Sequence, residues 1–176
     1  MKADGIWANI FRFGSRNQPL SEILHNIPLF QGLTPKELRI LAHAVHVRTY
    51  QTEETVFSEA EPGAGMYVIR SGKVDILLKQ ENQTSTLLAE LEAGDFFGEM
   101  ALLGDSTRSA TAVSRQQSEL IGFFQPDLLE LINLHPVIGA KISFGLAKTL
   151  AERLHFTNSQ LREVSDLRGS CEEPVR

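Results

Sequence analysis

Short strand-like runs separated by turn residues dominate the middle of this 176-residue chain. Their residues are branched or aromatic, as in strands, and they cover 56–57, 66–70, 74–78, 86–91 and 120–124. Ser71-Gly72 predicts a two-residue hairpin, and Glu81-Asn82-Gln83 predicts the next turn. Closely spaced short strands of this kind predict a sandwich or jelly roll.

Helix signals flank the strands on both sides. The segment 20–26 predicts a short helix, and Thr34-Pro35-Lys36-Glu37 is a helix start with an N-cap, a first-turn Pro and a capping Glu. Pro126 opens another helix, and His135-Pro136 starts a last one that meets no further Pro before Arg168. The predicted fold is therefore mainly β with flanking helices: a β-roll or jelly roll with N-terminal helices and a long C-terminal helix.

The N-terminal segment 6–13 carries Ile6, Ile10 and Phe13 on one side of a predicted amphipathic helix. One interpretation is contact with a membrane surface or a partner helix. The favoured one is packing against the chain's own β-structure, because the segment is short and weakly basic.

Composition narrows the functional classes. No apolar run has the length of a membrane span, and the N-terminus lacks the apolar stretch of a secretory signal. The single Cys171 cannot form an internal disulfide, which fits a reducing cytoplasm. A formal charge of −5 argues against broad nucleic-acid binding. We expect a cytoplasmic protein.

The segment 97–113 carries the clearest chemistry. After Phe96-Phe97 and Gly98, residues 99–103 have room for about one and a half helical turns, which the Gly104 turn ends; Arg108 and a strand-like run at 109–113 follow. The unpartnered amides of a first helical turn and the Arg108 guanidinium suit a phosphate. Glu99 in the same turn could accept a hydrogen bond from a neutral hydroxyl. The pattern predicts a pocket for a ligand with one phosphate, one free hydroxyl and an apolar face.

This run resembles the phosphate-binding cassette of the cyclic-nucleotide-binding domain family. The resemblance of the chain to that family covers residues 27 to about 154. The resemblance assigns the ribose 2′-hydroxyl to Glu99 and the cyclic phosphate to Arg108. It assigns backbone contacts to Gly98, Met100 and Ala101, and a place near the phosphate to Ser109. Three positions depart from the family pattern: Ala60 replaces a usual Gly, Ala64 a usual acid, and Thr107 a usual Pro.

The resemblance implies a regulatory sensor that binds cAMP in preference to cGMP, needs no metal and is not an enzyme. We expect a switch by movement of the two C-terminal helices, in which the apolar face of Leu102 and Leu103 meets Leu128, Leu129 or Ile132 and rotates the last helix. That helix has a heptad-like seam, which predicts a homodimer; the seam residues are Ala147, Leu150, Leu154, Thr157, Leu161 and Val164. For residues 147–154, packing of the helix onto its own domain is the alternative, and beyond Leu154 the dimer seam is favoured. An unidentified protein effector is expected, and no direct DNA binding, since the tail leaves no room for a helix-turn-helix.

Two other interpretations stay open. In one, Glu99 and Arg108 pair with each other in a β-roll scaffold that binds no nucleotide. In the other, the jelly roll holds a metal-dependent enzyme, which would need clustered histidines and carboxylates; the chain has five histidines, and His43 and His46 lack a nearby third ligand. The expected organisation is an N-terminal helical extension (1–26), the β-roll with its entry and hinge helices (27–135), a C-terminal helix that acts as lid or dimer seam (136–168) and a disordered tail (169–176).

Overall fold

Two antiparallel four-stranded sheets make up the centre of the molecule. The computed structural model describes residues 18–80, 84–104 and 107–170, with side chains as far as Glu163. The first sheet has the order β1 (His46–Tyr50), β8 (Ser118–Phe124), β3 (Gly65–Ser71), β6 (Phe96–Phe97). The second has the order β2 (Thr55–Phe57), β7 (Thr111–Ser114), β4 (Lys73–Lys79), β5 (Ser85–Glu92). The predicted β-roll is confirmed, and each of the five strand-like runs lies within an observed strand.

Strand alternation divides the core into two layers. Between the sheets, Ile69 and Leu120 pack with side chains of the second sheet such as Ile76. On the other face of the same strands, Met66 and Phe123 pack under the helices. Successive side chains of a strand point to opposite faces, so β3 and β8 are apolar on both sides. This is why their sequences read as continuous apolar runs.

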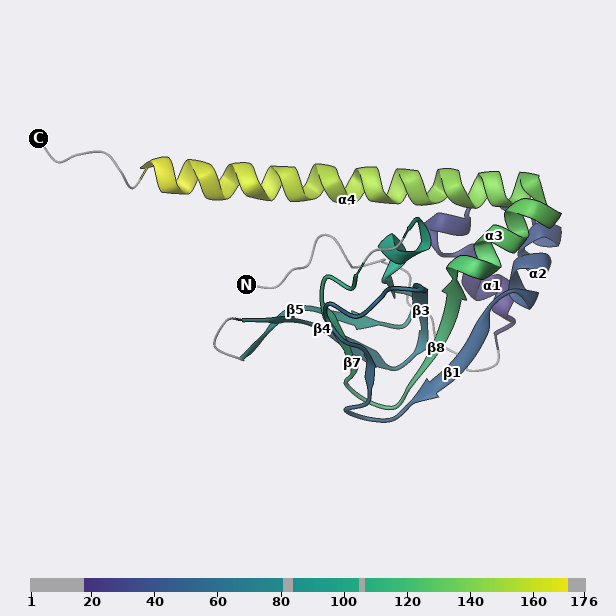
Figure 1. Ribbon diagram of the computed structural model, residues 1–176, viewed down its shortest axis with the longest axis horizontal. Coiled ribbons are helices and arrows are strands. Elements are labelled where there is room, and N and C mark those ends of the chain that lie inside the picture. Colours follow the sequence, from purple (N-terminus) through teal and green to yellow (C-terminus); the bar gives the residue numbers. More distant parts are fainter. Residues whose placement is uncertain (1–17, 81–83, 105–106, 171–176) are drawn as a thin grey trace, which may run out of the picture.

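Six helices cover and close this core within the described residues. They are α1 (Leu20–His25), η1 (Pro28–Phe30), α2 (Pro35–His43), η2 (Glu99–Leu102), α3 (Gln125–Leu134) and α4 (Pro136–Ser170). The predicted capping box at α2 is confirmed, with Thr34 N–H donating to Glu37 Oε2 at 2.7 Å and Glu37 N–H to Thr34 Oγ1 at 3.4 Å. Figure 1 shows α1, α2 and α3 gathered at one end and α4 running lengthwise above the strands. The predicted helix at 6–13 lies outside the described residues.

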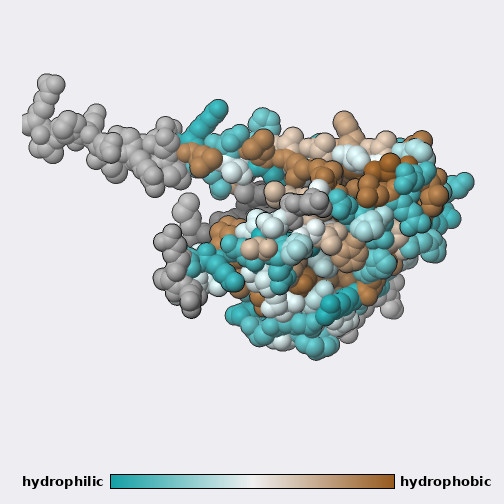
Figure 2. Space-filling model, in the orientation of Figure 1, coloured by the Kyte–Doolittle hydropathy of each residue, from teal (hydrophilic) through white to brown (hydrophobic). Residues whose placement is uncertain are grey.

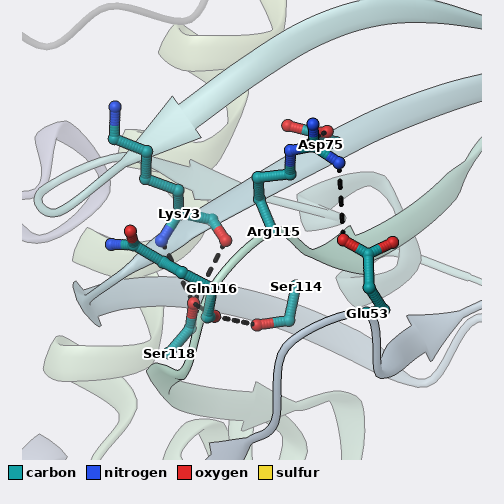
Figure 3. Close-up of polar contacts among 7 residues, drawn as sticks. All are labelled: Glu53, Lys73, Asp75, Ser114, Arg115, Gln116 and Ser118. Atoms are coloured by element: carbon teal, nitrogen blue, oxygen red, sulfur yellow. Dashed lines mark hydrogen bonds and ion pairs between the residues drawn. The ribbon is translucent and has the colours of Figure 1, made fainter.

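The Ser71-Gly72 turn is a corner between the sheets rather than the predicted hairpin, because β3 and β4 belong to different sheets. Gly72 has φ +99°, and a Cβ there would lie 2.2 Å from Ser118 Oγ. The buried Ser118 hydroxyl accepts from Lys73 N–H at 3.1 Å and lies 2.7 Å from Gln116 O (Figure 3). The corner therefore requires Gly at a position where the sequence indicated only a tight turn.

Three charged side chains lie beside this corner in Figure 3. Arg115 lies 3.7 Å from Asp75 and 3.4 Å from Glu53. Burial raises the pKa of the Asp75 carboxyl, and the Arg115 charge opposes the shift. Arg115 and Glu53 are both more than 60% exposed, so the group stabilises the turn only weakly.

The first half of α4 is anchored to the helical end of the molecule. Ile138, Ile142 and Leu146 are buried in the helical core. Gly145 packs so closely on η1 that a Cβ there would lie 2.2 Å from Leu29 O. Lys141 Nζ donates to both Glu37 carboxylate oxygens, at 2.8 and 2.7 Å. These contacts hold α4 by its first three turns.

Replacing Lys141 with Met should lower the free energy of unfolding at neutral pH by about 1 kcal/mol, because the pair is partly buried and two-pronged. The hydrogen bond from Lys141, then that from the Thr34 backbone, lowers the pKa of Glu37 from 4.5 to about 2. A lowered folded-state pKa stabilises the protein above pH 4.5, and the contribution is lost as pH falls toward 2. In urea titrations, the difference in free energy of unfolding between wild type and Lys141→Met should therefore become smaller below pH 4.5.

Lys148→Met is the matched control, since Lys148 reaches Glu152 only at 3.9 Å and both are over 60% exposed. Its free energy of unfolding should match that of wild type at every pH. If the difference in free energy of unfolding between wild type and Lys141→Met stayed constant from pH 7 to 2.5, the stabilising role of the Lys141–Glu37 pair would be contradicted.

The opposite face of α4 is apolar and exposed. Val137, Phe144, Leu154 and Leu161 are each more than 60% exposed, and Figure 2 shows apolar side chains gathered along the helix. Leu150, predicted in the outward seam, is instead partly buried against the helical core. No helix in the described part of the chain is long and apolar enough to cross a membrane.

Candidate functional site

The chain enters the site at Gly98, which has a left-handed backbone with φ +76°. A Cβ at Gly98 would lie 2.6 Å from Arg108 Nη1 and 3.2 Å from Gly65 O. Gly is thus required both for the turn and for the approach of the guanidinium. The segment that follows is η2, a four-residue 3₁₀ helix, rather than the predicted one and a half turns through Leu103.

Arg108 is buried, with 7% of its surface exposed. Its Nη1 donates to Gly65 O at 2.7 Å and to Gly98 O at 3.3 Å, and its guanidinium lies 3.9 Å above the centre of the Phe57 ring. Its Nε is buried and has no hydrogen-bond partner among the described residues. Burial lowers the pKa of Arg108, although Arg remains protonated at neutral pH. A buried cation with neutral partners and an unused donor is suited to an anion.

The backbone of Arg108 is clamped by the loop before β3. Ala60 N–H donates to Arg108 O, and Arg108 N–H donates to Glu61 O, both at 2.8 Å. Ala60 has φ +67°, so it adopts the left-handed conformation that the family pattern normally gives to Gly. Both backbone hydrogen bonds therefore form although Ala60 replaces the usual Gly, and the left-handed conformation of Ala60 strains the backbone.

Replacing Ala60 with Gly should raise the free energy of unfolding by up to about 1 kcal/mol, because Gly adopts positive φ without a Cβ clash. Thermal and urea unfolding would measure the gain. Ala64→Gly, at a residue without positive φ, should give no gain and serves as the control. A lower melting temperature for Ala60→Gly would show that the strain argument is wrong.

Glu99 is also buried, and its partner comes from α4 rather than from Arg108. Glu99 Oε1 lies 2.5 Å from Arg153 Nη1, and the two side chains are 3% and 17% exposed. Among the described residues Glu99 and Arg108 make no ion pair with each other; Arg108 is held by backbone carbonyls instead. The direct pairing considered from the sequence is thus absent.

A cavity of about 380 Å³ lies between the β-roll and α4. All six residues that the sequence marked for ligand contact line it: Gly98, Glu99, Met100, Ala101, Arg108 and Ser109. From α4 come Leu150, Arg153, Leu154 and Thr157, and from the sheets Phe57, Ile76 and Phe97. Its volume falls in the range of small-molecule sites. Its wall is mostly apolar and carries three charged side chains, Glu99 paired with Arg153, and the buried Arg108.

The C-terminal helix was predicted as a lid or a dimer seam, but the individual side chains that close this cavity from α4 and from the sheets were not predicted. Phe57 was predicted in a strand, but its ring could not be matched to Arg108 without the fold. Leu150, Leu154 and Thr157 were predicted as residues of a dimer seam, and all three also line the cavity from the chain's own α4. Arg153 lies in the stretch Leu150 to Leu154, which resembles the terminal helix of the family. The sequence therefore pointed to this part of the helix but not to the ion pair that Arg153 makes.

The proposed switch contact is only partly as expected. Leu102 is buried in the same helical core as Leu128. Leu103, Leu129 and Ile132 are exposed, between 37% and 57%. Of the two leucines, only Leu102 is thus buried in the core that includes Leu128 of α3. Within the described ranges no group of three or more His, Cys, Asp or Glu residues could hold a metal ion.

Comparison with known proteins decides the family. The model of the cyclic nucleotide-binding domain matches residues 47–135, half of the chain. The chain belongs to the cyclic nucleotide-binding domain family. This domain contains the cassette from Gly98 to Ser109, and α4 lies beyond its matched end.

Two relatives and one solved structure illustrate the relationship. The cyclic AMP receptor protein of Thermus thermophilus is 34% identical over 125 residues, which is 71% of this chain and 58% of that protein. A cAMP-dependent protein kinase regulatory subunit of Colletotrichum orbiculare is 35% identical over 100 residues, 57% of this chain and 25% of that protein. The structure of Thermus thermophilus catabolite activator protein superposes with a TM-score of 0.71 at 34% identity, covering 78% of this chain and 63% of that one. The chain therefore spans under two thirds of each.

Proposed function

We propose that this chain is a non-catalytic regulatory domain that binds a cyclic mononucleotide, cAMP in preference to cGMP, in the cavity under α4. The observation that carries the proposal is Arg108: a buried guanidinium on the cavity wall with an unpartnered Nε and only neutral partners. A cyclic phosphate has one negative charge and would give the guanidinium, whose hydrogen bonds go to backbone carbonyls, a charged partner. The preference for cAMP is supported by relatives that are named for cAMP.

Glu99 is proposed to accept the hydrogen bond of the ribose 2′-hydroxyl. Its carboxylate is buried on the wall that also holds Arg108, so the two groups would contact one ligand. A site built for a hydroxyl rejects the analogue that lacks it, because a buried acceptor is left unpaired. Backbone groups of Gly98, Met100 and Ala101 and the hydroxyl of Ser109 would complete the phosphate contacts.

Isothermal titration calorimetry of the purified chain with cAMP, cGMP and 2′-deoxy-cAMP tests the proposal. We expect saturable binding of cAMP, weaker binding of cGMP, and a loss of about tenfold or more for the deoxy analogue. No heat and no thermal shift at millimolar nucleotide would favour the other reading, a β-roll scaffold that binds no nucleotide. The Glu99–Arg153 pair is the feature consistent with that reading, because it satisfies Glu99 without a ligand.

The output is proposed to pass through α4 to a second copy of the chain and to an effector protein in the cytoplasm. The exposed apolar residues Val137 and Phe144, and Leu154 and Leu161, recur at intervals of seven, and Ala147 is exposed on the same helix. A repeat of seven is the pattern of a two-helix seam. The seam we propose therefore differs from the sequence prediction, since it includes Val137 and Phe144 and omits Leu150 and Thr157. Sedimentation equilibrium with and without cAMP would test the dimer.

A further inference from the structure

Arg108 is held by aromatic rings as well as by backbone carbonyls. The central carbon of its guanidinium lies 3.9 Å above the centre of the Phe57 ring and 5.9 Å above that of Tyr67. Among the described residues Arg108 forms no ion pair, and the family's usual acid at position 64 is Ala in this chain. The charge of this buried guanidinium therefore meets an aromatic face and neutral oxygen atoms.

The Phe57 ring is fixed by two aromatic side chains of the first sheet. Phe57 lies on β2 of the second sheet, and its ring centre is 6.0 Å from that of Tyr67 on β3 and 5.8 Å from that of Phe97 on β6. Tyr67 and Phe97 stack on each other, with ring centres 5.6 Å apart. Three rings packed in this way restrict the rotamer of Phe57, so the ring face that meets Arg108 has a defined position.

An aromatic face suits a buried cation that has to bind an anion. The face carries partial negative charge and attracts a guanidinium most strongly where water is excluded. A carboxylate in the same place would neutralise Arg108 and repel an incoming phosphate. The ring has no net charge, and the donors of a guanidinium lie in its plane, so a ring over its central carbon leaves them available. Nε of Arg108 is such a donor, because it is buried without a partner among the described residues.

We propose that Phe57 is a positioning residue, which holds the Arg108 guanidinium at the cavity wall with its free donors available to the ligand phosphate. The inference rests on the proposed function. It adds to that function a residue of β2, which lies far from the cassette in the sequence. Phe57 also lines the cavity, so its action through Arg108 has to be distinguished by experiment from a direct contact with the nucleotide.

The first test measures cAMP affinity by calorimetry on the full chain with Phe57 replaced by phenylalanines of increasing fluorination. Fluorine withdraws electron density from the ring face and changes the size of the side chain little. The affinity should therefore fall stepwise, by about tenfold over the series. The same replacements of Phe30, which is buried against Phe123 in the helical core, are the matched control and should leave the affinity unchanged. Equal affinity across the Phe57 series would overturn the inference, because packing alone would then account for this ring.

A double-mutant cycle separates action through Arg108 from direct contact with the nucleotide. Phe57→Leu should lower cAMP affinity about tenfold when Arg108 is present. In the Arg108→Gln background the same substitution should cause no further loss, because no cation is left to position. An equal loss in both backgrounds would show direct contact and overturn the inference. Wild-type protein that binds neither cAMP nor cGMP would overturn the proposed function as well, a result distinct from normal binding by wild type and by every fluorinated form.

Discussion

Replacing Arg108 with Gln is expected to weaken cAMP binding about ten- to hundredfold while leaving the fold intact. A hydrogen bond to a charged group contributes about 1.5–3 kcal/mol, and the guanidinium supplies the charge for the phosphate. In the free protein its hydrogen bonds go to two backbone carbonyls, so the substitution leaves no uncompensated buried charge. The free energy of unfolding should therefore change by less than about 1 kcal/mol.

Calorimetry gives the affinity and urea unfolding gives the stability of the same Arg108→Gln preparation. Arg115→Gln is the matched control, because Arg115 is 61% exposed and lies at the far corner with Asp75 and Glu53. It should bind cAMP as wild type does. If Arg108→Gln bound cAMP with unchanged affinity, the phosphate would lie elsewhere and the proposed site would be wrong.

The fold was predictable because its signals are local. The alternating or continuous apolar runs of β3, β4, β5 and β8, and the capping box at Thr34, depend on residues within a few positions of one another. The corner at Gly72 was predicted wrongly as a hairpin. A two-residue turn looks the same in sequence whether the next strand pairs with its neighbour or crosses to the other sheet.

The candidate site was predictable to the extent that it is contiguous. Residues 98–101 and 107–109 lie close together in the sequence and line the same cavity wall. Arg153 joins Glu99 across 54 positions, and Phe57 lies under Arg108 across 51. Such pairs depend on the path of the chain, which no local spacing records. The resemblance marked the region of Arg153 but could not say which face of α4 it occupies.

The two halves of α4 are held to the rest of the molecule in different ways. The first half is fixed by burial and by the close contact of Gly145 with Leu29. The second half contacts the β-roll through Arg153, and Leu154 and Thr157 line the cavity beside it. A ligand in the cavity would thus contact the part of the helix that is held least, while the anchored half fixes the direction in which it can move.

Replacing Gly145 with Ala should destabilise the protein by about 1–3 kcal/mol, although Gly to Ala inside a helix normally stabilises by about 1 kcal/mol. The sign reverses because the new Cβ would lie 2.2 Å from Leu29 O and 3.0 Å from Leu29 C. Both are backbone atoms, so no change of rotamer relieves the overlap, and α4 must move away from η1. That movement also carries Leu150 and Arg153 away from the cavity, so cAMP affinity should fall together with stability.

Urea unfolding and calorimetry on Gly145→Ala measure the two effects, with Gly32→Ala as the control, since a Cβ at Gly32 would meet nothing within 4 Å. The control should stay within about 0.5 kcal/mol of wild type and bind cAMP normally. Higher stability for Gly145→Ala would mean that helix propensity outweighs the contact and that α4 is not anchored there. Lower stability with unchanged cAMP affinity would mean instead that the position of the first half of α4 does not determine the shape of the cavity. The contact of Gly145 with Leu29 would then stabilise the fold without affecting ligand binding.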